Sequence, residues 1–393
     1  MKVCDISSFY SDLGGGVRTY HHQKLAWFAR HPEHEYVMIV AGPDNQLTPE
    51  LGGRVYRVRG VPVSRKGHYR QLADYREIRR ILQAERPDVI EVGSAYLDCW
   101  LAWAAGRDSR AVFSGFYHAD FPDSYIAPAV SGLPAGLGRP FVNCWRHYVN
   151  FVYRRFDVTC VTSRYVQDKL RGFGLHNTFL VPLGVDTERF HPRERDERLR
   201  RELGVAPGET LLLYVGRFWS EKGIDVLASA MDALGRRPGL HLALAGDGAL
   251  EDRVRAAAAP HPRIRLLGFV ADPARLARLY ASADVFLSPG PYETFGLTTV
   301  EALSSGVPVV AADGGGAGET VAASDAGRLF RAHDPRDFIR RIDELLAADL
   351  PALGRRARCF AERNYSWQRT FGRLVGRYAE LCDARRASAA LAA

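Results

Sequence analysis

The chain has 393 residues, of which 47% are hydrophobic and 25% charged, and its formal net charge is +8 at pH 7. The length favours two domains of roughly 180–200 residues over a single core, and the composition is that of an ordinary globular protein. No run of about 18 apolar residues occurs, which excludes a transmembrane helix, and the evenly spread basic residues argue against binding to nucleic acid.

The N-terminus, Met1–Tyr10, has the pattern of a buried strand and lacks the apolar segment and cleavage site of a signal peptide. The six cysteines show no CxxC spacing. Buried free thiols explain them better than disulfides or metal ligands, so we expect a cytoplasmic protein.

In chain order, short apolar runs rich in β-branched residues alternate with amphipathic stretches. This alternation predicts parallel strands that are buried between two layers of helices. We expect strands over Val3–Ile6, Tyr36–Ala41, Val55–Val58, Val89–Val92, Ala111–Phe116, Val158–Thr162 and Phe179–Val181, and helices over Arg18–Arg30, Tyr69–Glu85 and Ser163–Arg171.

A charged stretch with two prolines, residues 186–208, interrupts the alternation and predicts a linker with a solvated helix. The alternation then restarts, with strands expected over Leu211–Val215, Leu240–Ala245, Ile264–Leu267, Val285–Leu287 and Val309–Ala311, and helices over Asp225–Leu234, Leu250–Ala258, Pro273–Ala281, Thr298–Ser304 and Pro335–Ala347. A long amphipathic helix, Ser366–Arg385, ends the chain.

The fold class that we predict is α/β, with two Rossmann-like, doubly wound parallel-sheet domains facing a cleft. The N-terminal domain is expected over residues 1–185, the linker over 186–208, the C-terminal domain over 209–365 and the final helical segment over 366–393. Sheets of this kind bind ligands beyond the carboxyl ends of their strands, so the cleft is the expected site.

Glycines follow two of the predicted strands. Gly14, Gly15 and Gly16 come after the first strand, where they let a backbone approach a ligand, and the next helix start offers free amides to an anion. A plain turn explains them as well. Thr19 stands where a dinucleotide fingerprint has its third glycine. A second turn of this type is Gly314–Glu319.

A basic pair follows the first strand of the second predicted domain. Arg217 and Lys222 lie in the stretch Gly216–Gly223, where the sheet is expected to open to the cleft. A planar guanidinium and a compact ammonium together suit a diphosphate. Two solvated surface cations are the alternative, but Lys222 is the only lysine in an arginine-rich half, which favours a function.

Two glutamates frame the start of a predicted helix. Glu293 precedes it and Glu301 lies eight positions further along. The opening amides of a helix have no intrahelical acceptors and can hold phosphate oxygens, while carboxylates accept hydrogen bonds from sugar and ribose hydroxyls. Spacing alone does not separate this role from helix capping.

A histidine, His118, leaves the carboxyl end of the predicted strand Ala111–Phe116. There it could contact a sugar hydroxyl or a reacting centre. A lone histidine is more often structural, and the sequence leaves that alternative open.

Together these segments resemble the retaining glycosyltransferases of family 4 (glycosyltransferase group 1), which have the GT-B fold. The matching segments occur in the family's order between residues 14 and 319: GGGVRTY, FYHAD, VPLGVDTERFHP, YVGRFWSEKG, ETFGLTTVEALSSGVPVVA and GGGAGE. The pair of glutamates with seven residues between them, preceded by GR…EKG, is the most specific of them.

The resemblance implies transfer of a hexosyl unit, of mannosyl or glucosyl type, from a nucleotide-diphosphate sugar to a hydroxyl acceptor with retention of configuration. The implied roles are diphosphate binding by Arg217 and Lys222, contact with donor sugar hydroxyls by Glu293, backbone contacts by Phe295, Gly296 and Leu297, ribose binding by Glu301, approach to the phosphates by Gly15 and Gly16, and a place beside the anomeric carbon for His118. The final helix is expected to cross back onto the first domain.

No metal is implied, and no two aspartates have the D-x-D spacing of the other large transferase fold. Two positions depart from the family: Thr294 stands where proline is frequent, and Ala119 separates His118 from Asp120, which leaves the role of Asp120 open. A nucleotide-sugar epimerase of the same fold and a non-catalytic nucleotide-sugar-binding protein are the alternative functions.

The partners that we expect are a donor, GDP-mannose or a UDP-hexose, and an acceptor that is a sugar, a lipid or a small molecule. The stretch Arg139–Arg155 mixes aromatic residues with arginines and could lie on the inner face of an anionic membrane. A buried helix with extended arginines is the alternative.

Overall fold

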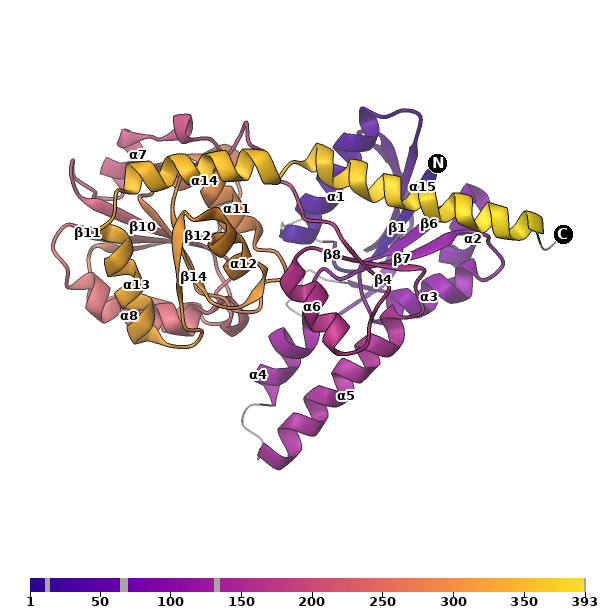
Figure 1. Cartoon of the computed structure of the whole chain (residues 1–393), viewed down its shortest axis with the longest axis horizontal. Coiled ribbons are helices and arrows are strands. Elements are labelled where there is room, and N and C mark those ends of the chain that lie inside the picture. Colours follow the sequence, from indigo (N-terminus) through magenta and orange to yellow (C-terminus); the bar gives the residue numbers. More distant parts are fainter. Residues whose placement is uncertain (11–14, 64–69, 131–134, 392–393) are drawn as a thin grey trace.

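In the computed structural model the chain forms two α/β lobes, each built around one sheet (Figure 1). The structure describes residues 1–10, 15–63, 70–130 and 135–391. The predicted fold class is confirmed: both sheets are mainly parallel and have helices on their faces, as in the GT-B fold.

Within the described residues the N-terminal sheet has nine strands, in the order β3-β4-β2-β1-β6-β7-β8-β9, with β5 beside β4. The strands from β2 to β8 are parallel to their neighbours, and their apolar residues are buried on both faces. The elements of this lobe are β1 (Lys2–Ser7), α1 (Gly16–Ala29), β2 (Glu35–Gly42), β3 (Gln46–Glu50), β4 (Gly53–Pro62), β5 (Arg70–Leu72), α2 (Tyr75–Glu85), β6 (Val89–Val92), α3 (Leu97–Gly106), β7 (Val112–Phe116), the π-helix η1 (Pro122–Ile126), α4 (Ala127–Ala129), α5 (Ala135–Tyr153), β8 (Val158–Val161), α6 (Arg164–Gly172) and β9 (Thr178–Leu180).

In the C-terminal half the described strands form a six-stranded, wholly parallel sheet in the order β12-β11-β10-β13-β14-β15. Its elements are β10 (Thr210–Val215), η3 (Ser220–Lys222), α8 (Ile224–Gly235), β11 (Leu240–Ala245), α9 (Glu251–Ala258), β12 (Ile264–Gly268), α10 (Pro273–Ser282), β13 (Val285–Ser288), α11 (Leu297–Ser304), β14 (Val309–Ala312), α12 (Gly315–Ser324), β15 (Gly327–Phe330), α13 (Pro335–Leu346) and α14 (Leu350–Asn364).

The two lobes are joined twice. The connecting segment contains η2 (Pro192–Glu194) and α7 (Glu197–Glu202), and α15 (Trp367–Leu391) runs from the C-terminal lobe along the N-terminal one (Figure 1). Where the two crossings meet, Val185 and Ser366 form a β-bridge, and a Cβ on Gly184 would lie 2.2 Å from the amide nitrogen of Trp367. The crossings therefore touch along their backbones, which only glycine allows at position 184.

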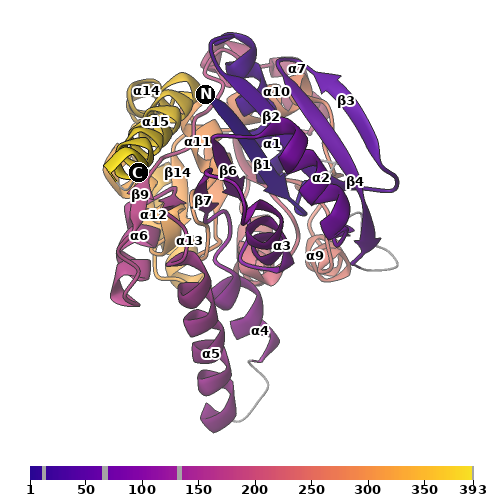
Figure 2. The ribbon, with the colours of Figure 1, turned by 90° about the vertical axis from the view of Figure 1, so that its right-hand side faces the viewer.

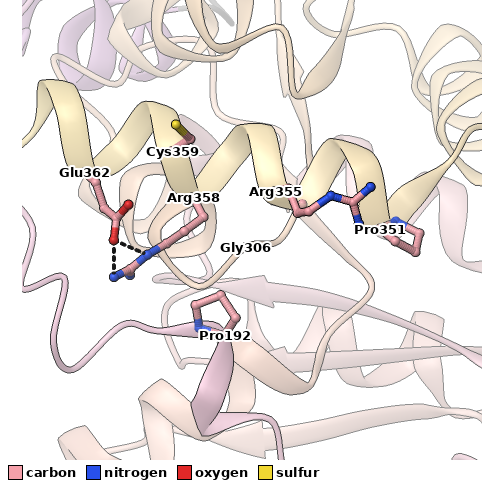
Figure 3. A pocket seen from close by; sticks show the side chains of 8 residues that line it. Pro192, Gly306, Pro351, Arg355, Arg358, Cys359 and Glu362 are labelled. Carbon is pink, nitrogen blue, oxygen red and sulfur yellow. Dashed lines mark hydrogen bonds and ion pairs between the residues drawn. The ribbon is translucent and has the colours of Figure 1, made fainter.

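A side chain from α14 ties this region together. Nη1 of Arg358 donates hydrogen bonds to the main-chain oxygens of Thr187, Phe190 and Ser304. Figure 3 shows the neighbouring pocket, where Pro192 of the connecting segment lies opposite the α14 face that carries Arg358 and its ion-pair partner Glu362. The far end of α11 is thus fixed to the connection between the lobes.

Several expected elements differ from the structure. The predicted helix Tyr69–Glu85 is wrong at its start, because residues 70–72 pair with β4 as an antiparallel edge strand and the helix begins at Tyr75, after the cap residue Asp74. The helix of the linker is not solvated on all sides, since Arg200 is buried and donates to Ser282 and Asp284. The Gly314–Glu319 turn is instead the first part of α12.

All six cysteines are free thiols, as expected, but only four of them are buried: Cys144 is exposed and Cys359 half-buried. In the part of the chain that the structure describes, no helix is both long and apolar enough to cross a membrane.

Candidate functional site

The strand order of the C-terminal sheet reverses between β10 and β13, so the loops that follow these strands diverge and leave a crevice. A small cavity lies there, lined by Tyr214, Val215, Gly216, Lys222, Leu287, Ser288, Pro289, Gly290, Glu293 and Thr298. The topology therefore brings the predicted basic loop, with Lys222, and the first predicted glutamate, Glu293, to the same crevice.

Lys222 and Glu293 are in direct contact in this crevice. Nζ of Lys222 donates to Oε1 of Glu293 over 2.6 Å, and both side chains are about three-quarters buried. The contact depends on glycine: Gly223 has φ +69°, and a Cβ there would lie 2.2 Å from the main-chain oxygen of Pro289. The short 3₁₀ turn η3 thus brings the ammonium against the loop that carries Glu293.

Arg217 reaches toward the N-terminal lobe. Its Nη2 lies 3.1 Å from Oε1 of Glu221, a buried carboxylate, and donates to the hydroxyl of Tyr125 over 3.2 Å. Tyr125 belongs to the π-helix η1, which follows His118 in the other lobe. Arg217 and Lys222 therefore both lie on the side of the C-terminal sheet that faces the first lobe.

The loop after Glu293 ends in the N-terminus of α11. Gly296 caps the helix with φ +87°, a conformation that favours glycine, and a Cβ on Gly16 would lie 3.3 Å from Cδ1 of Leu297. The side chain of Phe295 is buried against Tyr365 and belongs to the core. The opening amides of α11 have no intrahelical acceptors.

The glycine turn of the first lobe is described from Gly15 onward; Gly14 lies outside the described residues. Gly15 has φ +102° and caps α1. Since Gly16 closely approaches Leu297, the starts of α1 and α11 lie on opposite sides of the space between the lobes.

Glu301 lies in the second turn of α11. The hydroxyl of Tyr280 donates to its Oε2 over 2.9 Å. Burial raises the pKa of the Glu301 carboxyl to about 7, although the hydrogen bond from Tyr280 opposes the shift. The group can therefore be neutral or ionised near neutral pH.

If Glu301 binds the ribose of a nucleotide, as the sequence resemblance implies, its pKa makes that binding pH-dependent. Only the ionised carboxylate accepts two hydrogen bonds from ribose hydroxyls, so affinity for a nucleoside diphosphate rises with pH, by at most about tenfold per unit below the pKa near 7. Calorimetric titration between about pH 6 and 8 measures it. Glu301→Gln, which does not ionise, is expected to flatten the profile; an unchanged slope in this variant contradicts the assignment.

His118 follows β7 directly. Its ring stacks on Phe116 at 4.2 Å between centroids and meets the edge of Tyr20 at 5.0 Å. Burial lowers the pKa of His118 to about 3, with the nearby His21 as a second cause. The imidazole is therefore neutral at physiological pH, and its buried Nε2 has no hydrogen-bond partner among the described residues.

Asp120, whose role the sequence left open, is buried and bonded to other residues of the first lobe. It forms a buried ion pair with Lys169, which also pairs with Asp123, and it accepts a hydrogen bond from Tyr117. This cluster holds the loop between β7 and η1 to α6. A structural role follows for Asp120.

Direct hydrogen bonds cross between the lobes beside the site. The hydroxyl of Thr294 donates to the main-chain oxygen of His118 over 2.8 Å, and the hydroxyl of Thr162 donates to the main-chain oxygen of Thr294 over 3.0 Å. The carboxylate of Glu319 accepts from the amides of Arg164 and Tyr165. Sequence reasoning missed these contacts, apart from noting Thr294 as a departure from the family.

The structure thus brings Lys222 and Glu293 together, places Arg217 and Leu297 against the first lobe, and joins the backbone of His118 to Thr294. In the described part of the chain, Glu301 is connected to these residues only through the backbone of α11. Within the described ranges, no group of three or more His, Cys, Asp or Glu side chains could hold a metal ion.

Two family models match the chain. Residues 14–189 match the model described as Glycosyltransferase Family 4, and residues 209–348 match the model described as Glycosyl transferases group 1. The two matches together include every residue of the candidate site.

Named relatives are similar over most of the chain. A GDP-mannose-dependent alpha-(1-6)-phosphatidylinositol dimannoside mannosyltransferase of Mycobacterium tuberculosis (strain ATCC 25177 / H37Ra) is 32% identical over 319 residues, which cover 79% of each protein. Sulfoquinovosyl transferase SQD2 of Arabidopsis thaliana is 33% identical over 292 residues, which cover 72% of this chain and 54% of that protein.

Among solved structures, a sucrose-phosphate synthase from Thermosynechococcus elongatus superposes with a TM-score of 0.80 at 21% sequence identity. The superposition covers 98% of this chain and 99% of that one, so the same two-lobed fold accounts for nearly the whole molecule.

Proposed function

Since the chain belongs to the group 1 glycosyltransferases of family 4 and is a nucleotide-sugar-dependent hexosyltransferase, we propose that it transfers a mannosyl unit from GDP-mannose to an acceptor hydroxyl, with retention of configuration. The contact of Lys222 with Glu293 beside the start of α11 carries this proposal. It puts a cation for phosphate oxygens and an acceptor for sugar hydroxyls in one crevice.

In this proposal Arg217, Lys222 and the opening amides of α11 bind the diphosphate and stabilise its charge as the sugar departs. Glu293 accepts hydrogen bonds from the donor sugar, Glu301 from the ribose, and the backbones of Phe295, Gly296 and Leu297 contact the donor. Gly15 and Gly16 approach the phosphates from the first lobe. No metal is required, because two side-chain cations and a helix terminus supply the positive charge.

His118 completes the proposed site from the other lobe. Its neutral imidazole has a buried Nε2 without a hydrogen-bond partner among the described residues, and in this proposal that atom hydrogen-bonds a hydroxyl next to the anomeric carbon. A cationic imidazolium would instead oppose the positive charge that develops on the donor sugar. The low pKa therefore suits a place beside that sugar.

The donor is GDP-mannose in this proposal because the relative that matches 79% of both proteins is named for it. The proposed acceptor is the hydroxyl of a lipid-linked glycan, in line with the phosphatidylinositol dimannoside in that name. UDP-hexoses are the alternative donors.

We expect release of GDP from GDP-mannose, in the presence of acceptor and EDTA, to exceed release of UDP from UDP-glucose at least tenfold. Nucleotide-release assays measure both, with membrane lipid extract or synthetic glycolipid as the acceptor. In a thermal-shift assay GDP is expected to raise Tm more than UDP, because a ligand that binds only the folded state stabilises it.

The reverse ranking of the two nucleotides would contradict the donor assignment. Loss of turnover in EDTA that is restored by a divalent ion would contradict the metal-free chemistry. An acceptor-independent change of the sugar would contradict group transfer.

We also propose that residues 1–185 and 209–365 act as two lobes that close on the donor, with 186–208 and the crossing at 366 as their connections. The backbone contact of Gly184 with Trp367 and the Val185–Ser366 bridge support a hinge there. Binding the diphosphate between α1 and α11 would hold the two lobes in contact.

Peripheral contact with the inner face of an anionic membrane is the last part of the proposal. The antiparallel projection of α4 and α5 extends away from the body of the molecule (Figure 2). Phe141 and Phe151 are 48% and 37% exposed on α5, and residues 135–156 carry four arginines and no acidic residue. Exposed aromatic rings beside arginines suit the interface of an anionic bilayer.

We expect the protein to co-sediment with vesicles of phosphatidylcholine and phosphatidylglycerol, and several-fold less with phosphatidylcholine alone. The double variant Phe141→Asp/Phe151→Asp is expected to abolish the binding. Phe269→Asp is the matched control, because Phe269 is 54% exposed in the other lobe. Equal sedimentation with both vesicle types, or none with either, contradicts the membrane contact.

A further inference from the structure

We infer that Thr294 is a positioning residue that aligns the two halves of the proposed site, by fixing the Glu293 loop of one lobe to the His118 loop of the other. The inference rests on the proposed function of those two loops. We assign Thr294 no contact with substrate, because its hydroxyl and its main-chain oxygen are both hydrogen-bonded to protein groups.

Two polar groups of this residue, its hydroxyl and its main-chain oxygen, are bonded to the first lobe. Its hydroxyl donates to the main-chain oxygen of His118 over 2.8 Å, and its main-chain oxygen accepts from the buried hydroxyl of Thr162 over 3.0 Å. His118 and Thr162 lie just beyond the ends of the adjacent strands β7 and β8. One residue of the second lobe is thus bonded to two strand ends of the first.

On its other side the same loop is fixed within the second lobe. The amide of Gly316, in the first turn of α12, donates to the main-chain oxygen of Glu293 over 2.6 Å, and a Cβ on Gly315 would lie 2.7 Å from that oxygen. The Glu293 backbone cannot shift toward α12, so movement of Thr294 and movement of Glu293 are coupled.

The connection between Glu293 and His118 is short. It runs along the backbone from Glu293 to Thr294 and then through the hydrogen bond from the Thr294 hydroxyl to the main-chain oxygen of His118. In the proposed chemistry the donor sugar is held by Glu293, and the imidazole must meet it from across the cleft. Donor binding uses groups of the C-terminal lobe for the most part, whereas the reaction needs both lobes in register. Loss of the Thr294 hydroxyl should therefore lower kcat more than it weakens donor binding.

The test is the isosteric change Thr294→Val, which removes the hydroxyl and keeps the shape and the main-chain bond to Thr162. We expect kcat to fall about tenfold while KM for the donor changes less than twofold. Thr294→Ser retains a hydroxyl and is expected to restore kcat to within about threefold of the wild type. Thr162→Val should show the same pattern, since it removes the second bond.

Thr159→Val is the matched control. Thr159 lies on β8 three residues before Thr162, and its hydroxyl donates to the main-chain oxygen of Tyr153 inside the first lobe. It is expected to lower Tm as much as Thr294→Val without lowering kcat. The inference is overturned if Thr294→Val keeps wild-type kcat, if Thr294→Ser fails to restore it, or if the loss follows Tm in the same way as for Thr159→Val.

A readout without turnover separates this inference from the proposed substrates. Hydrogen exchange of the peptide that contains residues 117–121 should be several-fold faster in Thr294→Val than in the wild type, and unchanged in Thr159→Val. If GDP-mannose proves not to be the donor but exchange changes in this way, the alignment stands and the donor assignment fails. Unchanged exchange in Thr294→Val overturns the alignment whatever the donor.

Discussion

Replacement of Lys222 or Glu293 by alanine is expected to reduce kcat/KM by tens to thousands of fold. The ammonium lies 2.6 Å from the carboxylate in a crevice beside the start of α11. Loss of a preorganised charge at such a site costs about 2–4 kcal/mol of transition-state stabilisation, because the leaving diphosphate gains charge as the sugar departs. Steady-state nucleotide release with purified variants measures the effect.

The two single variants are expected to differ in kind. Lys222→Ala removes charge from the diphosphate, so it should lower kcat strongly and weaken GDP binding. Glu293→Ala removes hydrogen bonds to the sugar, so it should lower kcat while GDP alone binds normally. Titration of each variant with GDP therefore separates a phosphate contact from a sugar contact.

Arg236→Ala provides the control for the charge change. Arg236 follows α8 in the same lobe and its side chain is 74% exposed, paired only with Asp232 among the contacts of the described residues. This variant is expected to retain wild-type turnover. Normal turnover in both Lys222→Ala and Glu293→Ala would show that the donor binds elsewhere.

The sequence predicted those parts of the fold whose pattern is set by burial on two faces. The central strands of both sheets are near-continuous apolar runs, and their predicted positions agree with the structure to within a few residues. The edge strands β3 and β5 were missed, because edge strands alternate with polar residues and β5 has only three residues. Their pairing with β4 is antiparallel, which the alternation of strands and helices does not encode.

The candidate site likewise has residues that the sequence predicted and residues that it missed. Lys222 and Glu293 were found because each lies in a loop that directly follows a predicted strand; the structure adds that these strands, β10 and β13, are neighbours at the point where the sheet order reverses. Tyr125 was missed: it lies on a π-helix in the other lobe and reaches Arg217 only when the lobes meet. Contacts between lobes depend on their relative orientation, and no local pattern in the chain reports it.

A buried charge cluster in the first lobe carries the largest expected effect on stability. Lys24 is fully buried on α1, and its ammonium donates to Asp5 and Glu91 at 2.8 Å. Tyr378 of α15 donates to the same oxygen of Glu91, Oε2. The attraction of Lys24 holds the pKa of Asp5 at about 2, against the effect of burial, whereas burial raises the pKa of Glu91.

Lys24→Met is therefore expected to destabilise the protein by about 3–5 kcal/mol, because two carboxylates remain buried without their cation. Thermal unfolding would show a Tm lower by roughly 10 °C. Arg107→Met is the control: Arg107 pairs with Asp108 at the surface of the same lobe, where both side chains are more than half exposed and an ion pair contributes at most about 1 kcal/mol. Equal stability of the two variants would contradict a structural role for the cluster.

The pH dependence of this effect has a definite sign. In the wild type the folded pKa of Asp5 is below its unfolded value, so Asp5 contributes stability above pH 4, and this contribution is lost as the pH falls toward 2. Without Lys24 both carboxyls would have folded pKa values above their unfolded ones, and the variant would lose stability as the pH rises from about 4 toward those raised folded values. The difference in unfolding free energy between wild type and Lys24→Met should therefore be larger at pH 7 than at pH 5. Because Tyr378 bonds to Glu91, hydrogen exchange in α15 should rise in the variant, which would show that the cluster also anchors the crossing helix.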